Sequence, residues 1–334
     1  MTTIALDGAT LEKLVSAAVA APSIHNTQPW RFRLDPVTST IEVHAAPERA
    51  LPHTDPEGQS LHLSAGAAVF NLRVAVAHFG WDPIVRLLPR PADPGLLASV
   101  RLAGPGPGLR SGTQLYGSAP YGAGLYDAVW RRHSSRFPFT GPPVGADVRA
   151  EITAAATAEG AILVFPTPSE TARILAVTAE AERLAAADRG RSDESRAWVR
   201  EGTQDGIPSV ALGPRDATGR LPVRDFTAGH APHVQEPVPF EERPVLAVLG
   251  TARDTRADWL RAGQGLEHAL LVATAHGVQA SLFSQGVEWP EAHWALRDPR
   301  GGTANVQMLV RFGYGPEGPA TPRRPVRDVL DTNL

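Results

Sequence analysis

Hydrogen-bonding side chains crowd into a short loop between a helix-like run and a strand-like run. The loop, residues 20–32, reads AAPSIHNTQPWRF and holds Ser23, His25, Asn26 and Gln28 between two prolines. Such side chains can donate and accept hydrogen bonds, and histidine can exchange a proton near neutral pH. Proline and small polar residues also punctuate an ordinary helix stop and turn. The loop alone therefore indicates either a ligand-binding loop or a plain turn.

Arginine and serine gather in a second stretch, WRRHSSRF at residues 130–137. Guanidinium forks and hydroxyls together bind a phosphate dianion through charge-assisted hydrogen bonds. Arginines near a helix C-terminus are also favoured by the helix dipole, so a solvated helix end explains the same pattern. A third stretch, TPRRPVRDVL at 321–330, places Arg323 and Arg324 between prolines that stiffen the backbone. It is either a basic tail or a second part of a phosphate clamp.

Composition narrows the classes of function. The 334 residues carry a net charge of −3 and include no cysteine. Disulfides, thiolate metal sites and thiol catalysis are therefore excluded, and no global attraction to nucleic acid or an acidic membrane is expected. We find neither a signal-peptide pattern nor a membrane-spanning run, and expect a cytoplasmic protein. His230 and His233 form no regular ligand pair across the intervening proline, so we predict no metal site.

Two fifteen-residue segments resemble each other and must position these stretches. They are GAAVFNLRVAVAHFG at 66–80 and GQGLEHALLVATAHG at 263–277. Apolar residues recur in both at helical spacing, and each segment predicts a helix that ends at a left-handed glycine, Gly80 or Gly277. A helix-like run followed by a strand-like run also occurs twice, at 10–34 and at 147–165.

The repeat predicts two related α/β units that pack as a pseudo-dimer within one chain. We assign residues 1–115 to the first half and 116–334 to the second, because a Gly/Pro-rich stretch near 104–124 separates them. A charged, weakly patterned segment over 188–240 reads as an irregular insertion. Insertions of this length are often lids or binding loops, and we predict a lid.

Together the three polar stretches resemble the nitroreductase superfamily of FMN-binding proteins, most closely its Acg-like branch. The resemblance covers about residues 8 to 330 and is strongest in APSIHNTQPWRF, with support from RRHSSR and PRRP. It implies an α+β, nitroreductase-type fold, a single-chain pseudo-dimer of two related halves that are each a β-sheet packed with helices. Homodimers of that family build each flavin site from an Arg-His-Ser-x-Lys/Arg motif in one subunit and a Pro-Ser-x-x-Asn-x-Gln-Pro-Trp loop in the other. One copy of each motif occurs in this chain, so we expect one non-covalent FMN in a monomeric pseudo-dimer or a weak homodimer.

The resemblance also implies which residues contact the cofactor. They are Pro22, Ser23, Ile24, Asn26 and Gln28 in the loop, Arg132, His133, Ser134 and Arg136 in the cluster, Gln285 and Gly286 in FSQG, and Arg323 and Arg324 in the tail. The Arg-His-Ser motif and one tail arginine would hold the ribityl phosphate. Arg136 would stabilise the charge that reduction leaves at the flavin N1–C2 edge. Gln285 and Gly286 would serve the N5 and O4 edge.

The activity that the resemblance implies is an FMN-dependent oxidoreductase that uses NADH or NADPH. Hydride would pass through flavin N5 to a small electron-poor acceptor such as a nitroaromatic or a quinone. The flavin would carry the chemistry, so we predict no catalytic side chain. The segment 188–240 leaves a second interpretation open, a catalytically weak FMN-sequestering protein of the Acg type with a lid over the flavin.

Overall fold

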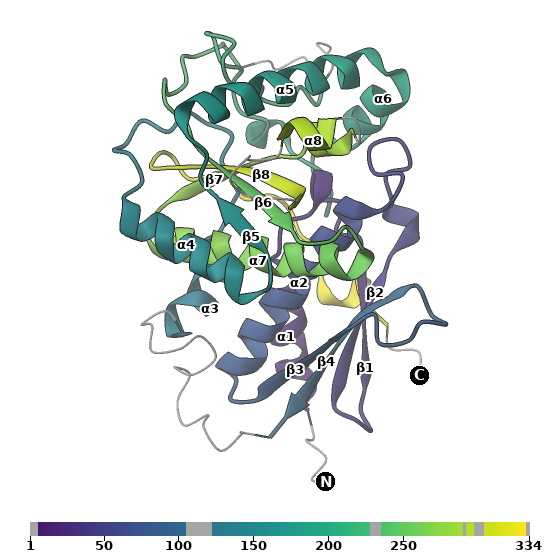
Figure 1. Cartoon of the computed structure of the whole chain (residues 1–334). Coiled ribbons are helices and arrows are strands. Elements are labelled where there is room, and N and C mark those ends of the chain that lie inside the picture. Colours follow the sequence, from purple (N-terminus) through teal and green to yellow (C-terminus); the bar gives the residue numbers. More distant parts are fainter. Residues whose placement is uncertain (1–5, 105–121, 228–234, 290–291, 297–303, 332–334) are drawn as a thin grey trace.

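Two packed helices lie between two β-sheets at the centre of the molecule (Figure 1). The computed structural model describes residues 6–104, 122–227, 235–289, 292–296 and 304–331. The central helices are α2 (Gln59–His78) and α7 (Arg256–Ala275). Gly80 and Gly277 follow them with φ of 91° and 71°, which confirms the predicted left-handed ends. Both helices begin seven residues earlier than the repeat (59 against 66, 256 against 263), because their first two turns, QSLHLSA and RADWLRA, have little sequence in common.

The central helices approach each other backbone to backbone at Gly66 and Gly263. A β-carbon on Gly66 would collide with the carbonyl oxygen of Leu260, and one on Gly263 would collide with that of Leu63. Glycine is therefore required at this crossing because no side chain fits between the two backbones.

Replacing Gly263 with alanine is expected to lower the free energy of unfolding by about 1–3 kcal/mol or more, since overpacking at this crossing must displace backbone. Urea denaturation followed by far-UV circular dichroism measures the change. Gly8→Ala is the matched control, because a β-carbon there meets nothing within 4 Å. Equal stabilities of the two variants would contradict the close crossing.

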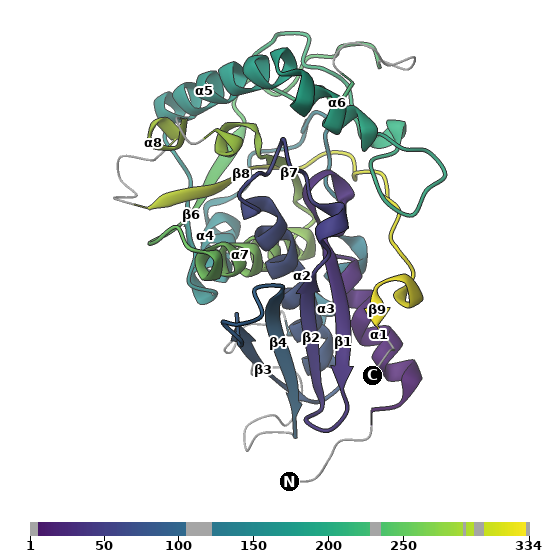
Figure 2. The same ribbon diagram turned by 90° about the vertical axis from the view of Figure 1, so that its right-hand side faces the viewer.

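The first sheet has the strand order β3-β4-β2-β1-β9. Its members are β1 (Trp30–Asp35), β2 (Thr40–Ala45), β3 (Asp82–Leu87), β4 (Leu96–Ala103) and β9 (Leu330–Asp331). The first four strands pair antiparallel, whereas β9 pairs parallel with β1. The C-terminal tail thus returns from the second sheet to the edge of the first, as Figure 2 shows beside α1.

The second sheet has the order β5-β6-β8-β7, and all its neighbours are antiparallel. Its members are β5 (Ile162–Val164), β6 (Val245–Thr251), β7 (Gln279–Phe283) and β8 (Asn305–Gly313). Read from its β7 edge, the second sheet contains its third, fourth, second and first strands in chain order. The order β3-β4-β2-β1 of the first sheet is the same. The predicted α+β class is confirmed.

The remaining helices cover the sheets and the central pair. They are α1 (Gly8–Val19), α3 (Gly122–Arg131), α4 (Ala146–Ala158), α5 (Pro168–Ala187), α6 (Arg189–Ala197) and α8 (His293–Leu296). Helices α5 and α6 lie across the upper end of the molecule in Figures 1 and 2. The prediction of irregular structure from residue 188 was wrong for α6. This helix buries none of its residues and is stabilised by the Asp188 cap, so it has no apolar periodicity to read.

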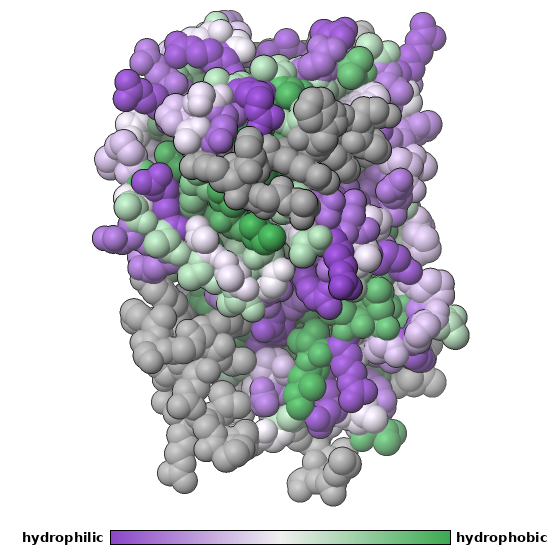
Figure 3. Space-filling view, viewed as in Figure 1, coloured by the Kyte–Doolittle hydropathy of each residue, from purple (hydrophilic) through white to green (hydrophobic). Residues whose placement is uncertain are grey.

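Helix α2 is the one described helix whose length and composition would suit a membrane span, but 89% of that window is buried inside the protein. Its side chains, including Phe70 and Leu72, belong to the main apolar core between the sheets. A buried core helix accounts for its composition. The described residues of the face in Figure 3 are mostly hydrophilic, with one apolar area in the upper half and another in the lower half.

Candidate functional site

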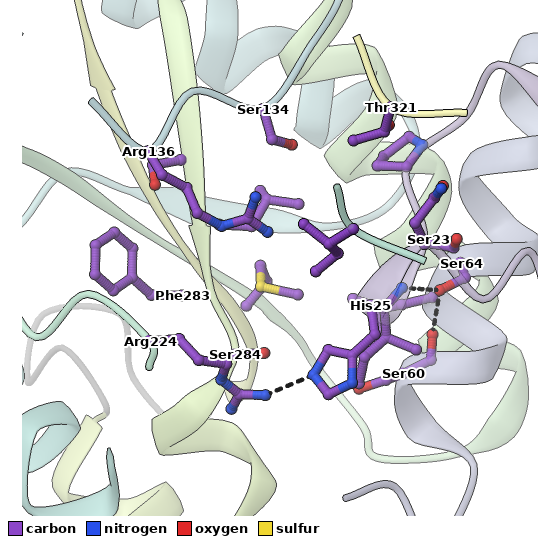
Figure 4. Close-up of a pocket in the computed structure, with 18 of the residues that line it drawn as sticks. Ser23, His25, Ser60, Ser64, Ser134, Arg136, Arg224, Phe283, Ser284 and Thr321 are labelled. Atoms are coloured by element: carbon purple, nitrogen blue, oxygen red, sulfur yellow. Dashed lines mark hydrogen bonds between the residues drawn. The ribbon is translucent and has the colours of Figure 1, made fainter. Parts of the chain in front are cut away.

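A cavity lies where the polar loop, the arginine–serine cluster, β7 and the C-terminal tail meet, and Figure 4 shows its lining. It encloses about 1110 Å³ of space including its mouth. The lining includes Pro22, Ser23, Ile24, Asn26, Arg132, Ser134, Arg136, Gln285 and Arg323 of the predicted contact residues. Gln28, His133, Gly286 and Arg324 lie outside that lining.

The polar loop has an unusual backbone. His25, Asn26 and Gln28 adopt φ of 46°, 55° and 52°, in the left-handed region that residues with a side chain rarely enter. Such conformations cost about 1–3 kcal/mol each and persist only where neighbours hold them. Here the Ser23 hydroxyl accepts from the Gln28 N–H at 3.0 Å, and Arg49 donates to the Gln28 carbonyl at 2.8 Å. The loop is therefore a fixed structure rather than a plain turn.

Asn26 ties the loop to two distant parts of the chain. Its amide nitrogen donates to the carbonyls of Gly206 at 2.8 Å and Pro322 at 2.9 Å. Its amide oxygen accepts from Arg323 at 3.0 Å. Gly206 belongs to residues 198–227, which we call the strap. The loop, the strap and the tail are thus held together at one side chain.

Gln28 has a similar joining position, behind the cavity lining. Its amide nitrogen donates to the carbonyl of Gln204 in the strap at 2.9 Å, and its amide oxygen accepts from the Arg324 N–H at 2.8 Å. Arg324 in turn pairs with Asp205. Asn26 and Gln28, both predicted contact residues, therefore connect the loop to the strap and to the tail by hydrogen bonds.

Two buried guanidinium groups meet beside the loop. Arg132 and Arg323 both donate to the carbonyl oxygen of Ala20, at 3.3 and 3.1 Å. Burial, together with the charge of Arg132, lowers the pKa of Arg323 to about 9. The carboxylate of Glu267 lies 3.4 Å from Arg132 Nε. Two cations facing one carboxylate leave excess positive charge, and the Nε atoms of both arginines have no hydrogen-bond partner among the described residues. This arrangement is typical of an anion site.

A second cationic group lies on the opposite wall of the cavity. Arg136 donates to the carbonyl of Ala211 in the strap at 2.9 Å, and its guanidinium lies 5.0 Å from the ring centre of Phe226. Burial and the nearby charge of Arg224 lower the pKa of Arg136 to about 10. Arg224 is itself paired with Glu288 at 2.6 Å. Arg136 is thus the cation on this wall that is available to a ligand.

His25 is held as a neutral imidazole with a defined tautomer. Arg224 Nη1 lies 2.8 Å from His25 Nε2, as the dashed line in Figure 4 shows. A guanidinium can only donate, so Nε2 accepts and the proton resides on Nδ1. Burial, followed by the charges of Arg224 and Arg136, lowers the pKa of His25 well below 6.5.

We therefore expect the nitrogen chemical shifts of His25 to stay constant between about pH 8 and pH 6. The native state resists protonating His25, so its contribution to stability falls as the pH drops below about 6.5, where the unfolded chain takes up a proton. Nitrogen NMR of labelled protein tests this, with His25→Gln used to assign the signal. A titration midpoint near 6.5 would contradict the neutral, buried imidazole.

His133 and Gly286 are the other predicted residues that lie outside the lining. His133 is half-buried, and burial with the charges of Arg132 and Arg323 lowers its pKa. A β-carbon on Gly286 would lie 2.9 Å from the Leu296 side chain, so Leu296 fills the space where a side chain would stand. Their roles toward a cofactor stay predictions.

Several lining residues were not predicted. From α2 come Ser60 and Ser64, and the Ser64 hydroxyl accepts from the Ile24 N–H at 3.1 Å while donating to the Ser60 carbonyl at 2.6 Å. The strap contributes Ile207, Val223, Arg224 and Phe226 to the lining. The available signal was the pair of serines four residues apart, since residues i and i+4 share one helix face. Nothing in the strap sequence marks its lining residues.

No group of three or more His, Asp or Glu that could hold a metal ion occurs among the described residues. His230 and His233 lie outside the described residues.

The structure is that of an α+β protein with two β-sheets and an arginine-lined cavity. Comparison with known proteins gives the family. The Mycobacterium tuberculosis protein named "Putative NAD(P)H nitroreductase Rv3131" is 31% identical and covers 97% of this chain and 92% of its own length. The protein named "Putative NAD(P)H nitroreductase acg" from the same organism is 30% identical and covers 96% and 95%. The chain belongs to this nitroreductase family, which confirms the resemblance drawn from the polar stretches.

Solved structures give weaker similarities. An FMN-bound nitroreductase from Bacteroides fragilis is 15% identical and covers 60% of this chain and 92% of its own, with a TM-score of 0.36. A BluB-like flavoprotein from Clostridium difficile 630 is 14% identical and covers 63% and 99%, with a TM-score of 0.40. No family model matches the chain.

Proposed function

We propose that this protein is an FMN-dependent, NAD(P)H-linked oxidoreductase that reduces a small electron-poor acceptor. The observation that carries the proposal is the pair Arg132 and Arg323, which line the cavity and converge on the Ala20 carbonyl. Family membership supports the use of a nicotinamide reductant, because the curated relatives are named for it.

The residues present fit the phosphate of FMN. Arg132, Ser134 and Arg323 all line the cavity, and the two arginines bring more positive charge than Glu267 balances. A dianion there would receive charge-assisted hydrogen bonds, which are about twice as strong as neutral ones. Of the two tail arginines, Arg323 lines the cavity, whereas Arg324 is paired with Asp205. We therefore assign the phosphate to Arg132, Ser134 and Arg323.

The opposite wall would take the ring system of the cofactor. Arg136 would supply a cation beside the pyrimidine edge, and Gln285 lines the same cavity with its amide nitrogen bound to the Pro222 carbonyl at 2.9 Å. When bound, FMN supplies hydride transfer through its N5 atom. The chain's own residues bind and orient it, the strap limits access of water, and Arg136 stabilises negative charge.

We further propose that the two halves, residues 1–115 and 116–334, imitate a homodimer. The shared strand order of the two sheets and the equal lengths of α2 and α7 support this reading. The single loop motif and the single arginine–serine motif then predict one FMN per chain. Purified protein is denatured, and the absorbance of the released flavin gives the ratio of FMN to chain. About one equivalent is expected, and two equivalents would contradict the single site.

A second candidate, an FMN-sequestering protein, is favoured by the strap. Side chains of Asn26, Gln28, Arg136 and Gln285 all bind strap carbonyls, at Gly206, Gln204, Ala211 and Pro222. A strap fastened at so many points would restrict entry of a nicotinamide. The two functions differ in whether NADH or NADPH reduces the bound flavin.

A further inference from the structure

A buried carboxyl group lies directly behind the arginine pair. Glu267, on α7, is 0% exposed, and neither of its oxygens accepts a hydrogen bond from a described residue. Its nearest charged neighbour is Arg132, whose Nε lies 3.4 Å from one oxygen. An ionised carboxylate without hydrogen bonds is costly in the interior, so its protonation state must respond to the charge around it.

The groups that face Glu267 come from each element packed around it. Arg132 follows the end of α3, and Arg323 lies on the tail. On α2, the amide of Asn71 lies beside the carboxylate and favours its ionised form without closing a hydrogen bond of normal length. The adjacent His268 on α7 is directed elsewhere, to Glu159 at 3.4 Å. Glu267 therefore responds mainly to the charge at the arginine pair.

Charge balance at the pair changes when a phosphate arrives. Without it, two arginines face one carboxylate. With a phosphate dianion, an ionised Glu267 would give three negative charges against two positive ones, whereas a protonated Glu267 gives two against two. In a poorly solvated site such an imbalance is strongly unfavourable.

We propose that Glu267 is a positioning residue of the phosphate site, which holds Arg132 as an ionised carboxylate in the cofactor-free protein and takes up a proton from solvent when a phosphate dianion binds Arg132 and Arg323. The inference rests on the proposed function, because the phosphate is that of FMN. Burial already raises the pKa of Glu267 to about 7, despite the opposing charges of Arg132 and Arg323. Glu267 therefore gains or loses its proton in the neutral pH range.

The coupling makes FMN affinity depend on pH in a defined direction. Below about pH 7 Glu267 is protonated in both states, and binding takes up no proton. Above it the free protein must gain a proton to bind, so the dissociation constant rises by about tenfold per pH unit until the pKa of the complex is reached. FMN itself is already a dianion there, since phosphate monoesters have a second pKa of about 6.

Isothermal titration calorimetry measures the proton directly. FMN is titrated into flavin-free protein at about pH 8 in two buffers of different ionisation enthalpy, which gives the number of protons bound. About one proton is expected for the wild type and none for Glu267→Gln, which keeps the shape but cannot titrate. Riboflavin, which lacks the phosphate, should bind without proton uptake. A merely structural glutamate would not produce this pattern.

The outcomes separate the inference from the proposed function. FMN binding to the wild type without proton uptake, or equal uptake by Glu267→Gln, overturns the role of Glu267 and leaves the flavin site intact. Absence of FMN binding in every buffer overturns the proposed function itself. If Glu267→Gln does not fold, infrared difference spectra of the wild type replace it. A protonated carboxyl band that appears with FMN but not with riboflavin supports the proposal, and no such band contradicts it.

Discussion

Purified protein in which Arg132 is replaced by alanine is expected to contain little or no FMN. Arg132 is buried, donates to the Ala20 carbonyl and, in our assignment, binds the phosphate. Hydrogen bonds to charged groups contribute about 1.5–3 kcal/mol each, so the loss of two of them weakens FMN binding by about 100-fold or more. Fluorescence titration with FMN measures the change, because flavin emission alters on binding.

Arg131→Ala is the matched control, since Arg131 is the adjacent residue but is exposed at the end of α3. Riboflavin separates loss of phosphate binding from misfolding. The wild type should prefer FMN to riboflavin, and the Arg132 variant should bind both weakly and about equally. Stoichiometric FMN in the purified Arg132 variant would overturn the phosphate assignment.

Replacing Phe226 with alanine is expected to speed reduction of the bound flavin by NAD(P)H by about tenfold. Phe226 lines the cavity from the strap and packs edge-on against His25, with ring centres 5.2 Å apart. Aromatic pairs contribute about 0.5–1.5 kcal/mol, so their loss raises the population of an opened strap by up to about tenfold. Arg136 and Arg224 lose a ring contact in this variant but keep their partners, the Ala211 carbonyl and Glu288, so FMN content should stay near that of the wild type. Anaerobic stopped-flow absorbance measures the rate.

Val210→Ala controls for a change elsewhere in the strap, because Val210 is 56% exposed and outside the cavity lining. Its reduction rate should equal that of the wild type. If Phe226→Ala also reacts at the wild-type rate, the strap does not gate access, and its predicted role as a lid is lost.

Much of the fold could be predicted because local signals agreed with tertiary structure. Apolar periodicity and terminal glycines located α2 and α7, and the strand-like run after the loop became β1. Helix α6 was not predicted because its stability comes from capping and exposed ion pairs, such as Arg196 with Asp193, rather than from a buried face. The pairing of the tail with β1 as strand β9 was not predicted either, because a strand of two residues has no periodic sequence pattern.

The site could be predicted only where a motif carried it. The loop, the cluster and the tail supply eight of the nine predicted residues that line the cavity, although about 300 positions separate Ser23 from Arg323. Sequence could not tell that Arg323 faces the cavity while Arg324 pairs with Asp205, because both stand in the same proline-flanked stretch. The strap residues could not be found at all. Their position depends on hydrogen bonds to backbone carbonyls, which any residue type provides.

The central claim is that a nicotinamide reduces a flavin bound in this cavity. Anaerobic rapid mixing of the purified, FMN-loaded chain with NADPH or NADH tests it most directly. We expect the flavin absorbance to bleach within seconds with at least one of the two. Bleaching by dithionite but by neither nicotinamide would contradict the oxidoreductase assignment and favour a protein that holds FMN beneath its strap.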